Sequence, residues 1–563
     1  MKKTNQIFSF FTLLVAFLCI ISCATNFSGS FNYTSKLPKV VLSVHSDEAD
    51  LSATSSISVK AELKNANNAT VQTITENLNV SEVVKTINTN NVEFEFDFKC
   101  HGKFLVEISL NSANGKTIHK ERQQVIITSD EYNIGSLSQT VPVSFFSLLV
   151  ADEDYNTFVD SSLVSYFCLE RDHQYDHSAL LPNMVEIPAL DNTSLDYVNR
   201  AAKYISYLHE LNSESYFHFF INDAELNLIS TFALDNGMAF DKFDITMFSD
   251  GTMTYNVFFD YFGNNPDDST EKYENLAKVW EEAKIKIANN DESYKLDILN
   301  AEGLKDWHQS MLHFNAVLLN DPDVNLKWIV NRISTDTFGN SSVFNTYLLP
   351  LKDKKFFALN LYNMYSALTE TEKQAVKNLL SLEVSEVEKA AAAGKKIMVF
   401  LGTKGITPKE VDYLTFMIKH FGSDYAYFYK GHPGDTVLAD PNSEKQNTFE
   451  SLGITAIDYS VPAEFYWFFL NNVNMDYVGY KSSTYNNITE ETYNAKIIFD
   501  TDYLDNSMDY TADLLMFFYN TVNGKDYYII HDTKNNKFTT WTNGADAVNL
   551  KWYSSRSLAI NKI

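Results

Sequence analysis

The segment 385–410, SEVEKAAAAGKKIMVFLGTKGITPKE, decides the fold class of this chain. Its first part, Ser385 to Ala393, has a helical pattern and is followed by Gly394, a residue type that commonly ends helices. Ile397 to Leu401 is then fully apolar, which is typical of a strand buried on both faces of a parallel sheet. Thr407-Pro408-Lys409-Glu410 has the cap, first-turn proline and third-position Glu of a new helix. The segment therefore predicts a βαβ repeat and an α/β fold.

The same alternation occurs earlier in the chain. Phe217 to Ile221 reads as a buried strand, Leu226 to Asn236 as a helix and Phe243 to Phe248 as another strand. We therefore expect two Rossmann-like domains, at about 141–375 and 376–530, that face a cleft and bind ligands at the carboxyl ends of their strands. A C-terminal extension at 531–563 follows, and Tyr527 to Ile530 with Lys537 to Trp541 indicates a hairpin there.

Residues 38–130 have a different pattern, in which short strands alternate apolar and polar positions. Ser56 to Ala61, Val92 to Phe96 and Phe104 to Ile108 are examples, and Asn114-Gly115 is a hairpin turn before the next strand. About 90 residues of this kind predict an immunoglobulin-like β-sandwich. It has no recognisable catalytic residues, so we interpret it as a spacer or adhesion module.

The first 37 residues indicate how the chain is delivered. Lys2 and Lys3 precede the apolar run Ile7 to Ile21, which is the pattern of a signal peptide over 1–22. The run ends in Ser22-Cys23, which resembles a bacterial lipobox and implies lipidation of Cys23. We expect a tether over 23–37 and a lipid-anchored protein at the outer membrane or cell surface. An uncleaved signal anchor is the alternative.

Composition excludes several function classes. The chain has 563 residues with 45 Lys and Arg against 72 Asp and Glu, a formal charge of −27, which argues against a nucleic-acid partner. It has four cysteines, too few for a disulfide scaffold, and none has metal-ligand spacing. We therefore expect no metal and no nucleic-acid partner. A monomer is also expected.

Three motifs follow predicted strands of the α/β region. They are Phe248-Ser249-Asp250-Gly251-Thr252, Lys430-Gly431-His432-Pro433 and Gly479-Tyr480-Lys481-Ser482-Ser483-Thr484. Each has an ordinary structural interpretation when taken alone, as a turn, a packed histidine or a helix cap. Their order is more specific, because Glu464 lies on a predicted helix between the second and third motifs.

This order resembles the bacterial sialyltransferases of glycosyltransferase family 80, over roughly residues 145–500. Phe248 to Tyr255 is similar to the family's Tyr-Asp-Asp-Gly-Ser-x-Glu-Tyr, and Tyr429 to Gly434 to its Phe-Lys-Gly-His-Pro-x-Gly. The segment with Trp307 and His313-Phe314 is similar more weakly. The resemblance implies the GT-B architecture, and some family members carry an immunoglobulin-like domain behind a lipoprotein signal.

The resemblance also implies roles for individual residues. Asp250 would be the general base for the acceptor hydroxyl, and His432 the donor of a proton or hydrogen bond to the leaving CMP phosphate. The donor-binding residues it implies are Lys430 and Gly431, whose backbone would recognise cytosine, Glu464 for the ribose, and Ser482 and Ser483 for the phosphate. On the acceptor side it implies Gly402, Thr403 and Ile406. The partners would be CMP-sialic acid and a glycan, without a metal cofactor.

Three positions depart from the family pattern. Ser249 replaces the first acid of Asp-Asp-Gly, Thr254 stands where the family has Glu, and Ile406 replaces the tryptophan of Gly-Thr-Thr-x-Trp. The residues that the resemblance implies for donor chemistry are thus better preserved than those it implies for acceptor recognition. The expected function is transfer of sialic acid from CMP-N-acetylneuraminate to a sugar hydroxyl, such as that of a galactoside. A transferase for another CMP-nonulosonic acid, or an inactive glycan-binding lipoprotein, are the alternatives.

Overall fold

The structure is a computed structural model, and it forms two compact units whose main boundary lies between Ser129 and Asp130. It describes residues 39–137, 164–169, 175–180, 184–191, 196–223, 227–249, 254, 257–258, 261–262, 266–302, 312–330, 333, 338, 341–358, 365–366, 368–402, 411, 414–415, 418–419, 421–432, 440, 443–470, 472–473, 475–479, 497–500, 528–532, 537–541, 550–552 and 558–560. Cys23 and the expected signal peptide and tether lie outside these residues. No helix in the described part is long and apolar enough to cross a membrane.

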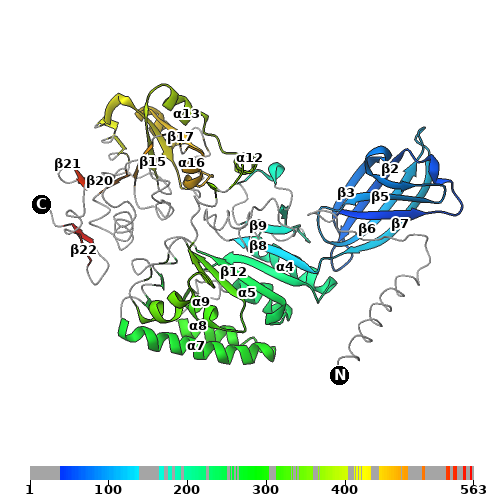
Figure 1. Ribbon diagram of the computed structural model, residues 1–563, viewed down its shortest axis with the longest axis horizontal. Coiled ribbons are helices and arrows are strands. Elements are labelled where there is room, and N and C mark those ends of the chain that lie inside the picture. Colours follow the sequence, from blue (N-terminus) through cyan, green and yellow to red (C-terminus); the bar gives the residue numbers. More distant parts are fainter. Residues whose placement is uncertain are drawn as a thin grey trace. The chain divides into compact units, whose positions relative to one another are not determined.

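The first unit is a β domain built from two antiparallel sheets (Figure 1). One sheet has the order β1-β5-β4 and the other β3-β2-β6-β7. Their strands are β1 (Lys39–His45), β2 (Ser56–Lys64), β3 (Thr70–Asn79), β4 (Val84–Ile87), β5 (Asn91–Asp97), β6 (Gly102–Asn111) and β7 (Thr117–Ile127). Alternate residues are buried along β2, β5 and β6, because one face of each strand lines the core. Gly115 adopts a φ of 79° in the turn between β6 and β7, as the Asn-Gly hairpin signal predicts.

The second unit begins with a seven-stranded sheet in the order β10-β9-β8-β11-β12-β13-β14, in which every neighbouring pair is parallel. The strands are β8 (Glu131–Leu137), β9 (Ser165–Leu169), β10 (Met184–Glu186), β11 (Tyr216–Asn222), β12 (Phe243–Phe248), β13 (Leu326–Val330) and β14 (Phe356–Ala358). The order runs outward in both directions from β8, as in a Rossmann fold. β8 precedes residue 141, at which we expected this region to begin.

A second sheet has the order β17-β16-β15-β18-β19-β20-β21. Its strands are β15 (Lys396–Leu401), β16 (Tyr425–Lys430), β17 (Ile454–Ile457), β18 (Met475–Gly479), β19 (Ile497–Asp500), β20 (Tyr528–Asp532) and β21 (Lys537–Trp541). All neighbours are parallel except β20 and β21, which form the hairpin expected near the C-terminus. That hairpin extends the sheet at its edge, and a small pair, β22 (Leu550–Trp552) and β23 (Leu558–Ile560), follows.

Helices join the strands of both sheets. They are α4 (Tyr197–Leu211), α5 (Asn227–Phe232), α7 (Pro266–Ala288), α8 (Tyr294–Glu302), α9 (Leu312–Asn320), α12 (Glu370–Leu379), α13 (Ser385–Ala392), α15 (Glu444–Leu452) and α16 (Ala463–Phe469), with the one-turn α2 (Val80–Val83) in the β domain. α7 packs on α8 and α9, α9 packs on β13, and α13 packs on β15 (Figure 1). The predicted fold class is therefore confirmed: an α/β body of the GT-B type with two Rossmann-like sheets, preceded by an all-β domain. The cleft expected between the sheets stays a prediction.

Candidate functional site

The carboxyl edge of the second sheet collects most of the predicted donor-binding segments. Leu401 pairs with Lys430 on one side and with Gly479 on the other, and Lys430 pairs with Ile457. Four neighbouring strands therefore end in one row, and the loops that follow them leave from the same edge. The strand order reverses between β15 and β18, which is the switch point where α/β sheets bind ligands.

Three further predicted donor-binding or catalytic residues that the structure describes lie at this edge. Gly431 is buried and His432 is exposed, directly after β16. Glu464 is 2% exposed in the first turn of α16, which follows the loop after β17. Ser482 and Ser483 lie outside the described residues, three and four positions after the end of β18 at Gly479.

Lys430 has a buried side chain, although its motif points to backbone recognition. Lys430 is 2% exposed, and its Nζ donates hydrogen bonds of 2.7 Å to the carbonyl oxygens of Gly431 and Tyr459. The backbone oxygen of Lys430 accepts a hydrogen bond of 2.9 Å from the N–H of Gly402. The ammonium group is therefore engaged inside the protein rather than presented to a ligand.

Gly402, one of the predicted acceptor-side residues, is held closely against Tyr429. A Cβ at position 402 would lie 1.7 Å from the Tyr429 hydroxyl oxygen and 2.0 Å from its Cζ. Tyr429 is fully buried, its ring lies 4.2 Å from that of Phe449, and the Nζ of Lys445 lies 4.9 Å from its ring centroid. Glycine at 402 is therefore a packing requirement. Thr403 and Ile406 lie outside the described residues.

Asp250, the predicted base, also lies outside the described residues, but both ends of its segment are visible. Ser249 is fully buried at the end of β12, and its N–H donates a 2.9 Å hydrogen bond to the Ile329 carbonyl of β13. Thr254 is fully buried as well. The segment of Asp250 therefore begins and ends at buried residues beside the carboxyl edge of the first sheet.

A buried carboxylate at this edge, Asp223, was missed by sequence reasoning. It is fully buried, and its Oδ2 accepts hydrogen bonds of 2.8 Å from the Thr254 hydroxyl and 2.9 Å from the Trp328 indole N–H. Its N–H donates to the Phe248 carbonyl at 2.8 Å, and its carbonyl accepts from the Asn315 side chain at 2.7 Å. Asp223 thereby joins β11, β12, β13 and α9.

The signal for Asp223 was present in the sequence. Asn222-Asp223 follows an apolar strand just as Ser249-Asp250 does, at the neighbouring strand end. β11 also lies next to β8, where the order of the first sheet reverses. Thr254, where the family has Glu, thus meets a carboxylate supplied from another strand.

The weakly similar segment around His313 packs in the interior. The imidazole of His313 stacks on the Tyr261 ring, with centroids 3.8 Å apart and planes 16° apart. Phe314 is fully buried, and Trp307 lies outside the described residues. This part of α9 therefore contributes packing to the first sheet.

A second buried group lies close to the predicted donor site, on α16. Burial raises the pKa of the Tyr466 phenol, two residues after Glu464, because it disfavours the charged phenolate.

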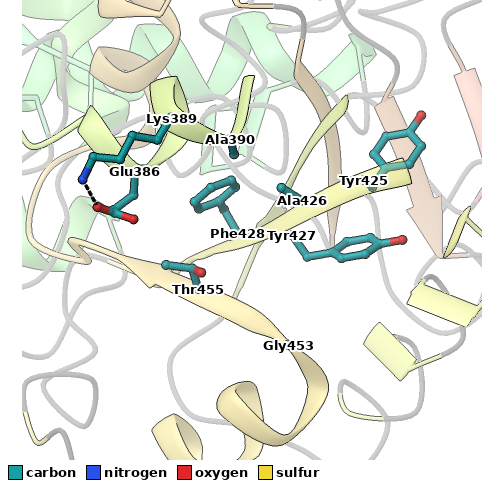
Figure 2. A pocket seen from close by; sticks show the side chains of 9 residues that line it. All are labelled: Glu386, Lys389, Ala390, Tyr425, Ala426, Tyr427, Phe428, Gly453 and Thr455. Carbon is teal, nitrogen blue, oxygen red and sulfur yellow. Dashed lines mark hydrogen bonds and ion pairs between the residues drawn. The ribbon is translucent and has the colours of Figure 1, made fainter. Parts of the chain in front are cut away.

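A cavity of about 340 Å³ opens at the other end of the second sheet. Figure 2 shows the side chains that line it. It is lined by Glu386, Lys389, Ala390, Tyr425, Ala426, Tyr427, Phe428, Gly453 and Thr455. Tyr425 and Thr455 belong to the amino-terminal ends of β16 and β17, whereas Lys430 and Ile457 end these strands. This cavity is therefore separate from the predicted donor site. Among the residues that the structure describes, no three His, Cys, Asp or Glu side chains cluster to hold a metal.

No protein-family model matches this chain, and no curated protein matches it. Solved structures of bacterial sialyltransferases are similar to it at low identity. The sialyltransferase of Photobacterium damsela has a TM-score of 0.48 and 13% identity, covering 87% of this chain and 97% of that chain. An α/β-galactoside α-2,3-sialyltransferase of Photobacterium phosphoreum has a TM-score of 0.49 and 12% identity, covering 71% and 98%.

A third similar structure is the 2,6-sialyltransferase of Photobacterium sp. JT-ISH-224, in a ternary complex with the donor product CMP and the acceptor substrate lactose. Its TM-score is 0.47 and its identity 13%, covering 89% of this chain and 97% of that chain.

Proposed function

We propose that this protein is a sialyltransferase, which moves sialic acid from CMP-N-acetylneuraminate to a sugar hydroxyl of a galactoside. One observation supports it most strongly. The segment with His432, the helix with Glu464 and the end of β18 share the carboxyl edge of a Rossmann-like sheet, beside its switch point. That edge is where such sheets bind nucleotides.

The proposed reaction is a single displacement that requires no metal. Asp250 takes the proton of the acceptor hydroxyl while that oxygen attacks C2 of sialic acid. The bond from C2 to the phosphate oxygen of CMP breaks, and its electron pair leaves with the phosphate. His432 donates a proton or hydrogen bond to this phosphate, which Ser482 and Ser483 also bind, and Glu464 accepts from the ribose hydroxyls. Attack opposite the leaving group inverts the anomeric centre.

The test is incubation of the purified full chain with CMP-N-acetylneuraminate and lactose, with release of CMP and formation of sialyllactose as readouts. We expect Asp250→Ala and His432→Ala each to lower turnover at least about a hundredfold, the usual contribution of a general acid or base. Asp47→Ala and His45→Ala are matched controls, because these residues form a 3.1 Å pair at the surface of the β domain. Activity that survives both site substitutions would refute the assigned roles.

The two alternatives are separated by the same assay. Turnover only with a different CMP-nonulosonic acid would keep the mechanism and change the donor. Glycan binding without transfer or donor hydrolysis would identify the inactive glycan-binding lipoprotein, which the replacement of the family's tryptophan by Ile406 favours.

Anchoring is a separate part of the proposal. Lipid on Cys23 holds a monomeric protein at the outer membrane or cell surface. We expect metabolic labelling with a radioactive fatty acid to mark the wild-type chain and not Cys23→Ser. An unlabelled wild-type chain that keeps its first 22 residues would instead identify a signal anchor.

A further inference from the structure

Lys430 ends β16 at the edge that carries the predicted donor site, and its ammonium group joins two loops. One hydrogen bond reaches the carbonyl of Gly431, which directly precedes His432. The other reaches the carbonyl of Tyr459, in the loop between β17 and α16. Both bonds measure 2.7 Å.

The spacing along the chain links these bonds to the predicted site. His432 follows Gly431 in the first loop, and Glu464 lies five residues after Tyr459, in the first turn of α16. Sheet hydrogen bonds hold β16 to β17 only as far as the Lys430–Ile457 pair. Beyond that row, the Lys430 side chain connects the two departing loops.

An ammonium group is suited to this task. It offers three donors from one atom, so a single side chain can hold two carbonyls at a defined separation. A buried charge is costly unless hydrogen bonds satisfy it, so the ammonium group favours the loop arrangement in which both carbonyls face it. A solvent-exposed lysine would exert no such constraint.

We propose that Lys430 is a positioning residue, whose buried ammonium group sets the separation of His432 and Glu464 and thereby shapes the pocket for a CMP-sugar. This inference rests on the proposed function for its ligand. It differs from the family-based expectation, in which the backbone at this position recognises the base, because the side chain is assigned a role of its own.

The test compares Lys430→Met, Lys430→Gln and Lys445→Met in the full chain, with CMP as the probe in calorimetric titrations. Methionine removes all donors, whereas glutamine keeps neutral N–H donors. Lys445→Met is the matched control, since Lys445, on α15, is also a buried lysine and is 1% exposed. We expect Lys430→Met to bind CMP at least tenfold more weakly than wild type does. The affinity of Lys430→Gln should lie between those of Lys430→Met and wild type, and the affinity of Lys445→Met should stay within twofold of wild type.

Hydrogen exchange without ligand provides a readout that does not depend on activity. Loss of the connection should accelerate exchange of the amides in 430–432 and 458–461 together in Lys430→Met, and not in Lys445→Met. Unchanged exchange in both segments, or CMP affinity within twofold of wild type in a folded Lys430→Met, would overturn the proposal. If wild type does not bind CMP, the proposed function fails, and the exchange result still decides whether Lys430 positions the two loops.

Discussion

Gly402→Ala tests the close packing at the end of β15. The added methyl carbon would lie 1.7 Å from the Tyr429 hydroxyl oxygen. Ordinary contact needs about 3.5 Å, so the phenol must retreat by roughly 1.8 Å. Tyr429 is fully buried against Phe449 and beneath Lys445, so its ring has little room to move. We therefore expect a cost of about 3 kcal/mol, at the upper end of the range for overpacked cores.

A double-mutant cycle isolates this contact from other effects of the substitution. Tyr429→Leu removes the phenol and should cost about 2–4 kcal/mol for the lost burial. In that background the methyl group of Gly402→Ala occupies vacated space and should cost less than about 1 kcal/mol. The two substitutions should therefore show a favourable coupling of about 2 kcal/mol.

Hydrogen exchange of the β15 and β16 amides is the suitable assay. The chain has more than one unit, so a single global unfolding energy is not well defined, whereas exchange reports the opening energy of this sheet. Exchange should accelerate by about two orders of magnitude in Gly402→Ala and stay near the Tyr429→Leu rate in the double variant. Equal protection in wild type and Gly402→Ala, or additive effects in the cycle, would refute the packing argument.

Three further predictions concern buried groups. Thr254→Val removes a donor to the buried Asp223 carboxylate and should cost about 1–3 kcal/mol, whereas Thr254→Ser should retain most of the stability. Hydrogen exchange of the β11, β12 and β13 amides measures both losses, and equal acceleration in the two variants would count against the hydrogen bond. Burial lowers the pKa of His101 to about 4, below its usual 6.5, so its contribution to stability is complete above pH 6.5 and is lost as the pH falls toward 4, by about 3 kcal/mol. Exchange of the β domain between pH 7 and 4.5 should show this loss, and His101→Phe should reduce it. Burial raises the pKa of the Cys100 thiol to about 12 and that of Cys168 to about 11, so a disulfide reagent at pH 8 should modify neither until the chain unfolds, as peptide mapping would reveal.

Much of the fold could be predicted because its signals are local. The alternation along β2 and β5 and the apolar run of β15 depend on which face of a strand is buried, and neighbouring residues record this directly. The Asn114-Gly115 turn needs a positive φ that glycine adopts readily. For the same reason, His432 could be placed after its strand and Glu464 on its helix.

The position of each strand within its sheet could not be predicted in this way. β8 begins the first sheet between β9 and β11, although its residues precede the expected start at 141. Strand order depends on pairing between segments that are far apart in the chain, and no local pattern encodes that choice. The C-terminal hairpin illustrates the same limit, since its two strands were recognisable but their attachment to β19 was not.

The sequence by itself determined the periodicities, the turns and the motifs at strand ends, because each depends on residues close together in the chain. Only the tertiary structure decided that Lys430 is buried, that Asp223 joins three strands and α9, and that Tyr429 occupies the space beside Gly402. A lysine or aspartate is ordinarily exposed, and it becomes buried only when distant segments supply the hydrogen bonds that satisfy its charge. Those partners exist only once the strands have assembled.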